Sequence, residues 1–223
     1  MAAPCTDEKQ VYVPSTDGNL YSIDKATGKE NWRFATGGAI LTTPQLHKGK
    51  LYVGSGDGHV YAIDTTGKLL WQNSLGEPTI SSPAISDNKL FLGGPGALFC
   101  LSLSTGQLLW KFPTGGLVKV KPLATANRVY FTSWDGHAYC LESESGKLLW
   151  QRKIDSSFYY APATGNPALG QVLVLTTPRN LVIALDPLTG EEKWRASNIK
   201  AGYCSPSLAA DSVLVTTLDG IVA

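Results

Sequence analysis

The sequence predicts an all-β fold, a β-propeller of four-stranded antiparallel blades, and three observations lead to this prediction. A stretch of ten or eleven residues returns five times, and each copy ends in a tryptophan four residues after a glycine. These tryptophans follow one another at intervals of 39, 39, 40 and 44 residues. No segment reads convincingly as a helix. Because one four-stranded sheet cannot bury both of its faces, a period near 40 residues indicates blades that stack on their neighbours.

The repeated stretch reads as a strand, a tight turn and a second strand. Its fullest copy runs from Ala184 to Trp194 and places Asp186 before Thr189-Gly190. Glycine takes the positive φ of the turn, and the acidic side chain can accept hydrogen bonds from turn amides. We expect each tryptophan to bury a large ring on the outer strand, positioned by the glycine of its own copy. The predicted structural residues are Trp32, Trp71, Trp110, Trp150, Trp194, Gly28, Gly67, Gly106, Gly146 and Gly190.

Two further strands precede each copy. One is rich in Val, Leu and Tyr and ends in a turn, which is Asp-Gly at Asp17, Asp57 and Asp135, a strong hairpin signal. The turn differs in the third and fifth units, at residues 94–96 and 178–180. The other segment is built around a proline, which cannot donate a ladder hydrogen bond and so marks an edge strand, expected to line a central channel. These prolines are Pro44, Pro83, Pro122, Pro162 and Pro206.

The unit boundaries give a prediction for the whole chain. Residues 1–10 are expected to form an N-terminal tail, and residues 11–223 the repeat array. The first unit begins with its second strand at Val11, and the last ends as a third strand starts. We therefore expect four complete blades flanked by two partial terminal blades. This incomplete ring would be a fragment of a ring of seven or eight blades, with the remaining blades in the missing part of the chain.

The copies from Ser22 to Trp32 and from Ala184 to Trp194 resemble the tryptophan-docking motif of quinoprotein-type propellers, the PQQ-like repeats. The resemblance covers residues 11–220. The residue after each tryptophan excludes the WD type of propeller, which has Asp there. The resemblance implies the propeller fold and suggests three parent proteins. They are a quinoprotein alcohol dehydrogenase, an outer-membrane assembly lipoprotein, and an acyl-activating enzyme similar to the β-alanine-activating enzyme.

Similarity to the dehydrogenases would imply PQQ held by a tryptophan floor, an adjacent-cysteine disulfide and oxygen ligands for Ca²⁺. This chain has no adjacent cysteine pair, and its proline segments hold no cluster of Asp, Glu and Asn. Cys100 and Cys140 occupy the small-residue position of Ala62 and Ala184, which favours buried, unpaired thiols. We therefore expect no PQQ, no calcium or other metal site, and no catalytic residue.

The candidate binding residues are those at which single units depart from the repeat. Lys119 stands where the first two proline segments have Leu41 and Ile80, and aromatic residues stand there in the last two. Lysines beside aromatic rings could bind a carboxylate, a phosphate or a peptide segment. The alternative is a solvated channel wall of long side chains. The predicted site, at one mouth of the channel, consists of Lys119, Lys121, Trp134, His137, Tyr159 and Tyr203.

The composition narrows the function classes. Nineteen Lys and Arg against 18 Asp and Glu give a net charge of +1, which predicts neither nucleic-acid binding nor attraction to anionic membranes. No segment is apolar enough for membrane insertion, and the N-terminus lacks the pattern of a signal peptide, which favours a cytoplasmic setting. The leading interpretation is a non-catalytic scaffold that binds a protein or small ligand at one propeller face. The alternatives are a fragment of a PQQ- and Ca²⁺-dependent alcohol dehydrogenase and an accessory propeller domain of an acyl-activating enzyme.

Overall fold

The computed structural model describes residues 2–154, 162–164, 172–177, 181–197, 205–208 and 213–215. Within these ranges every regular element is a β-strand, arranged as five four-stranded antiparallel sheets and one two-stranded sheet. We call the sheets blades 1 to 6 in chain order. The chain divides into two compact units, Met1–Pro113 and Thr114–Ala223. None of the described segments forms a helix of the length and apolarity that a membrane span requires.

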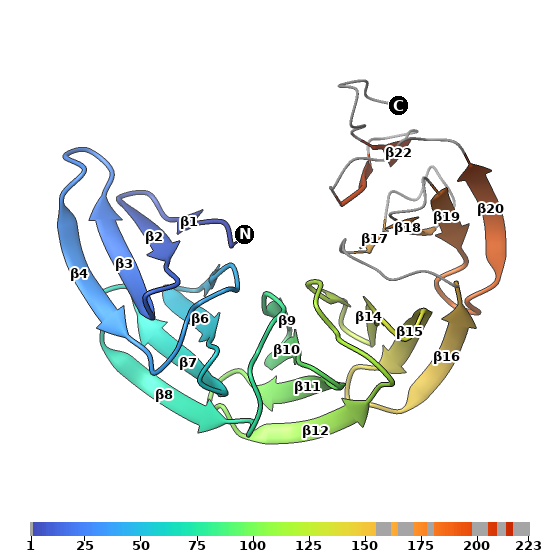
Figure 1. Cartoon of the computed structure of the whole chain (residues 1–223), viewed down its shortest axis with the longest axis horizontal. Helices are drawn as coiled ribbons and strands as arrows, with labels where there is room; N and C mark the ends of the chain where they lie inside the picture. The colour runs from blue at the N-terminus through green and yellow to red at the C-terminus, as the bar shows by residue number, and fades with distance from the viewer. Residues whose placement is uncertain are drawn as a thin grey trace. The chain divides into compact units, whose positions relative to one another are not determined.

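The first unit contains three blades that lie side by side, with β4, β8 and β12 along one edge (Figure 1). Blade 1 comprises β1 (Cys5–Thr6), β2 (Gln10–Pro14), β3 (Asn19–Asp24) and β4 (Glu30–Ala35). Blade 2 comprises β5 (Gln45–His47), β6 (Lys50–Gly54), β7 (His59–Asp64) and β8 (Leu69–Ser74). Blade 3 comprises β9 (Ala84–Ser86), β10 (Lys89–Gly93), β11 (Ala97–Ser102) and β12 (Leu108–Pro113).

The second unit contains blades 4 and 5 and the two described strands of blade 6. Blade 4 comprises β13 (Leu123–Ala124), β14 (Arg128–Thr132), β15 (His137–Glu142) and β16 (Leu148–Lys153). Blade 5 comprises β17 (Ala163–Thr164), β18 (Leu173–Thr177), β19 (Leu181–Leu185) and β20 (Glu192–Ser197). Blade 6 comprises β21 (Ser207–Leu208) and β22 (Val213–Leu214).

The all-β propeller blades are confirmed, but the expected count of four complete blades between two partial ones is wrong for the first blade. Cys5 pairs with Tyr12 and Thr6 with Val11, so the segment predicted as a tail supplies β1 and completes blade 1. A strand of two residues is too short to show the alternation by which strands are recognised in a sequence. In the described part of the chain, five blades are therefore complete and blade 6 is partial.

Each first strand begins immediately after its proline and lies at the edge of its sheet. Thus β5 follows Pro44, β9 follows Pro83 and β13 follows Pro122. The prediction placed the proline within the edge strand. The structure places it just before the strand, since proline has no N–H to donate to the ladder.

The third and fourth strands pair through the same irregular register in all five complete blades. A small residue lies directly opposite each tryptophan, as Cys100 does opposite Trp110 and Cys140 opposite Trp150, and the register shifts by one residue just after the pair. Both cysteines are fully buried, as predicted. Burial raises the pKa of Cys140 to about 11, because the thiolate would lose its hydration.

Tryptophan joins neighbouring blades instead of staying within its own copy of the repeat. The Trp32 ring packs on Gly67 of blade 2, where an added Cβ would lie 2.8 Å from Trp32 Cδ2. Its Nε1 donates a hydrogen bond of 3.0 Å to the Thr65 carbonyl oxygen in the same turn. On its other side, the ring lies 5.9 Å from the ring of Tyr12 in its own blade. The expectation that a tryptophan is positioned by the glycine of its own copy is therefore wrong.

The same arrangement joins blade 2 to blade 3 and blade 4 to blade 5. Indole Nε1 of Trp71 donates to the Leu103 carbonyl at 3.2 Å, and that of Trp150 donates to the Pro187 carbonyl at 3.0 Å. Their rings pack on Gly106 and Gly190 of the following blade. Glycine is therefore required at these positions for two reasons. Its backbone adopts a positive φ, and it has no side chain between the backbone and the indole ring.

Candidate functional site

In blades 2 and 4, the same set of hydrogen bonds, which we call the frame, holds the turn between the second and third strands. In blade 2, the Tyr61 hydroxyl donates to Asp57 Oδ2 at 2.6 Å, and the Gly37 N–H donates to the same oxygen at 2.7 Å. In blade 4, Tyr139 and Gly115 donate to Asp135 Oδ2 at 2.7 and 3.0 Å. Gly37 and Gly115 belong to the loops that enter the first strands. The frame therefore ties this loop to the following turn on one face of the blade.

The loop and the turn joined by this frame are in direct backbone contact. A Cβ added to Gly38 would lie 2.6 Å from the Asp57 backbone nitrogen, and one added to Gly116 would lie 2.6 Å from that of Asp135. Both glycines close an identical Thr-Gly-Gly sequence, at residues 36–38 and 114–116. The repeated sequence is thus explained by the direct contact of two backbones.

Hydrogen bonds lower the pKa of both carboxylates of this frame. Burial of Asp57 raises its pKa, but hydrogen bonds from Tyr61 and from the His59 and Gly37 N–H groups outweigh burial and lower the pKa below its usual value. Burial and the bond to Asp57 together raise the pKa of Tyr61 to about 12. Asp135 is affected in the same way, and its pKa is also lowered.

Blade 4 adds a cation–aromatic pair to the shared frame. The Lys119 ammonium lies 5.5 Å from the centroid of a Trp134 ring, within the range of a cation–π interaction. The backbone N–H of Trp134 donates to the Leu117 carbonyl at 2.9 Å, which fixes the turn that carries the indole. In blade 2 the equivalent residues are Leu41, which is 55% exposed, and Gly56. The frame requires neither Lys119 nor Trp134.

Lys121 is exposed two residues after Lys119 and precedes the buried Pro122. Desolvation by the surrounding protein lowers the pKa of the Lys121 ammonium from its ordinary value. Of the six predicted site residues, Tyr159 and Tyr203 lie outside the described part of the chain.

His137 belongs to its own turn. Its Nδ1 lies 3.1 Å from the Asp135 carbonyl oxygen, and its ring packs beside Tyr139. His59 has the same relation to Asp57 in blade 2, at 3.3 Å. The structure thus brings together Lys119 and Trp134, while the contacts of His137 are those of a repeated turn residue.

The described residues of the predicted site include two lysines and an indole. Lys119 and Lys121 carry ammonium groups, which are donors suited to anions, and Trp134 is a partly exposed aromatic residue. Among the described residues, no group of three or more His, Cys, Asp and Glu side chains is arranged to hold a metal ion.

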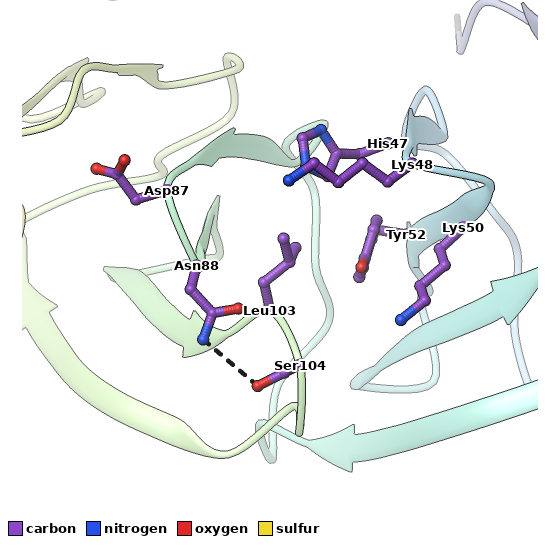
Figure 2. A pocket seen from close by; sticks show the side chains of 8 residues that line it. All are labelled: His47, Lys48, Lys50, Tyr52, Asp87, Asn88, Leu103 and Ser104. Carbon is purple, nitrogen blue, oxygen red and sulfur yellow. Dashed lines mark hydrogen bonds between the residues drawn. The ribbon is translucent and has the colours of Figure 1, made fainter.

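The structure contains a second candidate site, which the sequence analysis did not predict. A cavity of about 330 Å³ lies between blades 2 and 3, lined by residues that include Lys48, Lys50, Tyr52 and Ser104 (Figure 2). The signal in the sequence was the first residue of each second strand, which is glutamine in blade 1, lysine in blades 2 and 3, and arginine in blade 4. Only the structure shows that Gln10, Lys50 and Arg128 face the next blade.

Several solved structures share this fold. BamB from Moraxella catarrhalis is 17% identical and has a TM-score of 0.81 over 100% of this chain and 75% of its own. The computationally designed protein Ika8 is 20% identical, with a TM-score of 0.84 over 99% of this chain and 69% of its own. The quinohemoprotein alcohol dehydrogenase of Comamonas testosteroni is 16% identical, with a TM-score of 0.79 over 90% of this chain and 43% of its own. At these identities the likeness shows the fold alone.

The search of curated proteins gives no match. The resemblance to PQQ-like repeat proteins is confirmed, whereas the suggested acyl-activating enzyme finds no support in the comparisons. The family model described as outer membrane protein assembly factor BamB matches residues 2–79 and 56–202, and so covers most of the sequence. The chain therefore belongs to the family of the outer membrane protein assembly factor BamB.

Proposed function

We propose that the chain is a non-catalytic propeller module that binds a protein partner through Lys119, Lys121 and Trp134 of blade 4. The family model that matches this chain is described as an assembly factor, and membership of this family supports a role in protein interaction. The observation that carries the proposal is the Lys119 ammonium placed over Trp134 on a frame that blade 2 builds without either residue. An acidic segment fits this chemistry best, because its carboxylates accept from the lysines while an apolar side chain covers the indole.

The equivalent residues of blade 2 define a variant that tests the surface formed by Lys119, Lys121 and Trp134. Lys119→Leu, Lys121→Thr and Trp134→Gly together give blade 4 the residues that blade 2 carries as Leu41, Thr43 and Gly56. The frame around Asp135 should therefore persist in this triple variant. Lys147→Gln is the matched control, because it removes an exposed charge from another turn of blade 4.

The experiment is affinity capture from an extract of the source organism, followed by crosslinking and mass spectrometry. The wild type and Lys147→Gln should recover the same partner, crosslinked near residue 119, and the triple variant should lose it. Equal recovery by the triple variant, or crosslinks confined to other blades, would refute this surface as the partner site.

Addition of PQQ and Ca²⁺ separates the enzymatic alternative from a binding module. We expect no quinone absorbance, no shift in melting temperature and no dye reduction with alcohols. Saturable PQQ binding with alcohol-dependent dye reduction would contradict the proposal. The cytoplasmic setting favoured by the sequence stays a prediction, to be checked by cell fractionation.

A further inference from the structure

In two blade junctions, the first residue of the second strand reaches across to the next blade. Gln10 Nε2 donates to the Thr65 carbonyl at 3.4 Å between blades 1 and 2. Arg128 Nη1 donates to the Pro187 and Leu188 carbonyls at 3.1 and 3.2 Å between blades 4 and 5. Both side chains reach the turn on which the tryptophan docks. This position therefore closes the gap beneath the docked indole.

The junction of blades 2 and 3 is left open at this position. Lys50 is the equivalent residue, and among the described residues its ammonium has no hydrogen bond or ion pair. The cavity of about 330 Å³ lies here, between Lys50 and the next turn at Leu103 and Ser104 (Figure 2). Its volume is that of a small-molecule site and exceeds the space of a few water molecules.

The side chain of Tyr52 lines this cavity. Tyr52 is only 2% exposed, and its ring packs 6.0 Å from that of Trp71. In blade 1, the equivalent Tyr12 donates its hydroxyl to Asp7 Oδ2 at 2.6 Å. Among the described residues, the Tyr52 hydroxyl has no such acceptor. It is not one of the buried polar atoms left without a partner, so the hydroxyl is open to the cavity that Tyr52 lines. An accessible phenol without a protein acceptor can donate a hydrogen bond to a ligand in this cavity.

The charged side chains that line the cavity indicate the kind of ligand that fits it. Figure 2 shows Lys48 and Lys50 on one hairpin and Leu103 across the cavity from them, whereas the Asp87 carboxylate points away from both lysines. On the opposite side, Asn88 Nδ2 donates to Ser104 Oγ at 3.4 Å. The wall thus offers two ammonium groups and a phenol as donors, beside the apolar surface of Leu103.

We propose that this cavity binds a small organic anion, whose carboxylate or phosphate oxygens accept from the Tyr52 hydroxyl and the Lys50 and Lys48 ammonium groups. The apolar part of the ligand packs on Leu103. Carboxylate and phosphate share this recognition chemistry, since both present oxygen acceptors with negative charge. The site is separate from the partner surface of blade 4 and does not depend on it.

The test is a titration of the full chain followed by amide chemical shifts in NMR. Sodium phosphate and sodium acetate form two arms, and sodium chloride at equal ionic strength is the reference. At least one of the two anions should give saturable shifts centred on residues 50–53 and 103–104, and the arm that saturates identifies the anionic group. Shifts equal to those in chloride in both arms would overturn the proposal.

Substitutions of Lys50 and Tyr52 test whether these side chains donate to the anion. Lys50→Gln should weaken affinity about tenfold, equivalent to ~1.4 kcal/mol, and Tyr52→Phe roughly threefold through the loss of one neutral hydrogen bond. Lys29→Gln, which removes an exposed lysine from blade 1, should bind as the wild type does. Unchanged affinity in both Lys50→Gln and Tyr52→Phe, with saturable binding in the wild type, would place the anion elsewhere and refute the site.

Discussion

The indole of Trp71 lies directly against Gly106 of the following blade, so that a Cβ on Gly106 would stand 2.4 Å from Trp71 Cε3. Gly106 also has a φ of +75°. Two separate requirements, backbone conformation and space, thus coincide at one residue. The next blade is held by this contact and by the hydrogen bond from Trp71 Nε1 to the Leu103 carbonyl.

Replacing Gly106 by alanine should therefore destabilise the chain more than the backbone conformation alone explains. We expect a loss of about 3–5 kcal/mol in the free energy of unfolding, of which roughly 1–2 kcal/mol is left-handed strain and the rest overpacking against Trp71. Gly28→Ala is the control, because Gly28 has a φ of +70° and nothing within 4 Å of its added Cβ. Urea unfolding of both variants measures the difference. Equal losses would show that the indole contact contributes nothing.

Tryptophans should differ in their contribution according to burial. Trp150 is 8% exposed and docked, whereas Trp194 is 40% exposed. Trp150→Ala should cost about 3–5 kcal/mol in unfolding free energy, as expected for a buried aromatic residue, and Trp194→Ala less than half of that. Thermal or urea unfolding of the two variants compares them directly. A larger loss in Trp194→Ala would mean that the contacts described for Trp150 do not determine stability.

The hydrogen bond between Tyr61 and Asp57 should stabilise the fold, and the matching bond between Tyr21 and Asp17 should matter less. Both bonds are 2.6 Å long, but Tyr61 is 6% exposed while the Tyr21–Asp17 pair lies at the surface. Tyr61→Phe should lower the unfolding free energy by about 1–2 kcal/mol, because it leaves a partly buried carboxylate short of a donor. Tyr21→Phe should change it by less than about 0.5 kcal/mol, and a reversed order would contradict the account.

Low pH should destabilise the hydrogen-bond frame around Asp57 and Asp135. The pKa values of Asp57 and Asp135 are lower in the folded chain than in the unfolded one, where an aspartate titrates near about 3.9. Their stabilisation is therefore complete above the unfolded pKa and is lost as the pH falls through the lowered folded pKa. Unfolding free energy measured from pH 7 to pH 2 should fall mainly below about pH 4. Asp57→Asn should flatten that fall, and an unchanged slope would exclude Asp57 as a contributor.

Much of the fold could be predicted from the sequence because it rests on local chemistry. Asp57-Gly58 and Thr189-Gly190 mark turns through their own backbone requirements, and a period near 40 residues indicates stacked blades. The partner of each tryptophan could not be read in this way. Trp32 meets Gly67 across a blade junction, 35 residues further along the chain, and no local pattern states whether a ring packs on its own turn or the next one. The two-residue strand β1 was missed for lack of length.

The candidate site was predictable only in part for the same reason. Lys119 and Trp134 depart from the repeat, and the comparison of units identified them, so their contact was expected from the shared face. The cavity at Lys50 was not identified, because Lys50 fits its strand as well as Gln10 or Arg128 does. What distinguishes it is a bond across the junction that Gln10 and Arg128 make and Lys50 does not.

Arginine at position 50 should close the cavity. Lys50→Arg gives blade 2 the residue by which Arg128 bridges blades 4 and 5 at 3.1 Å. The longer guanidinium should reach the carbonyls of the next turn and raise the unfolding free energy by about 0.5–1.5 kcal/mol, the net value of a hydrogen bond. Lys29→Arg is the matched control at an exposed position and should leave stability unchanged. A Lys50→Arg variant no more stable than this control would mean that the junction does not depend on that bridge.

Hydrogen exchange of the indole N–H groups tests most directly the claim that docked tryptophans fasten blade 1 to blade 2, blade 2 to blade 3 and blade 4 to blade 5. The Nε1 atoms of Trp32, Trp71 and Trp150 donate to carbonyls of the following blade at 3.0, 3.2 and 3.0 Å. Their NMR signals should exchange with solvent much more slowly than that of Trp194, whose ring is 40% exposed. Exchange of Trp32, Trp71 and Trp150 as fast as that of Trp194 would contradict the account.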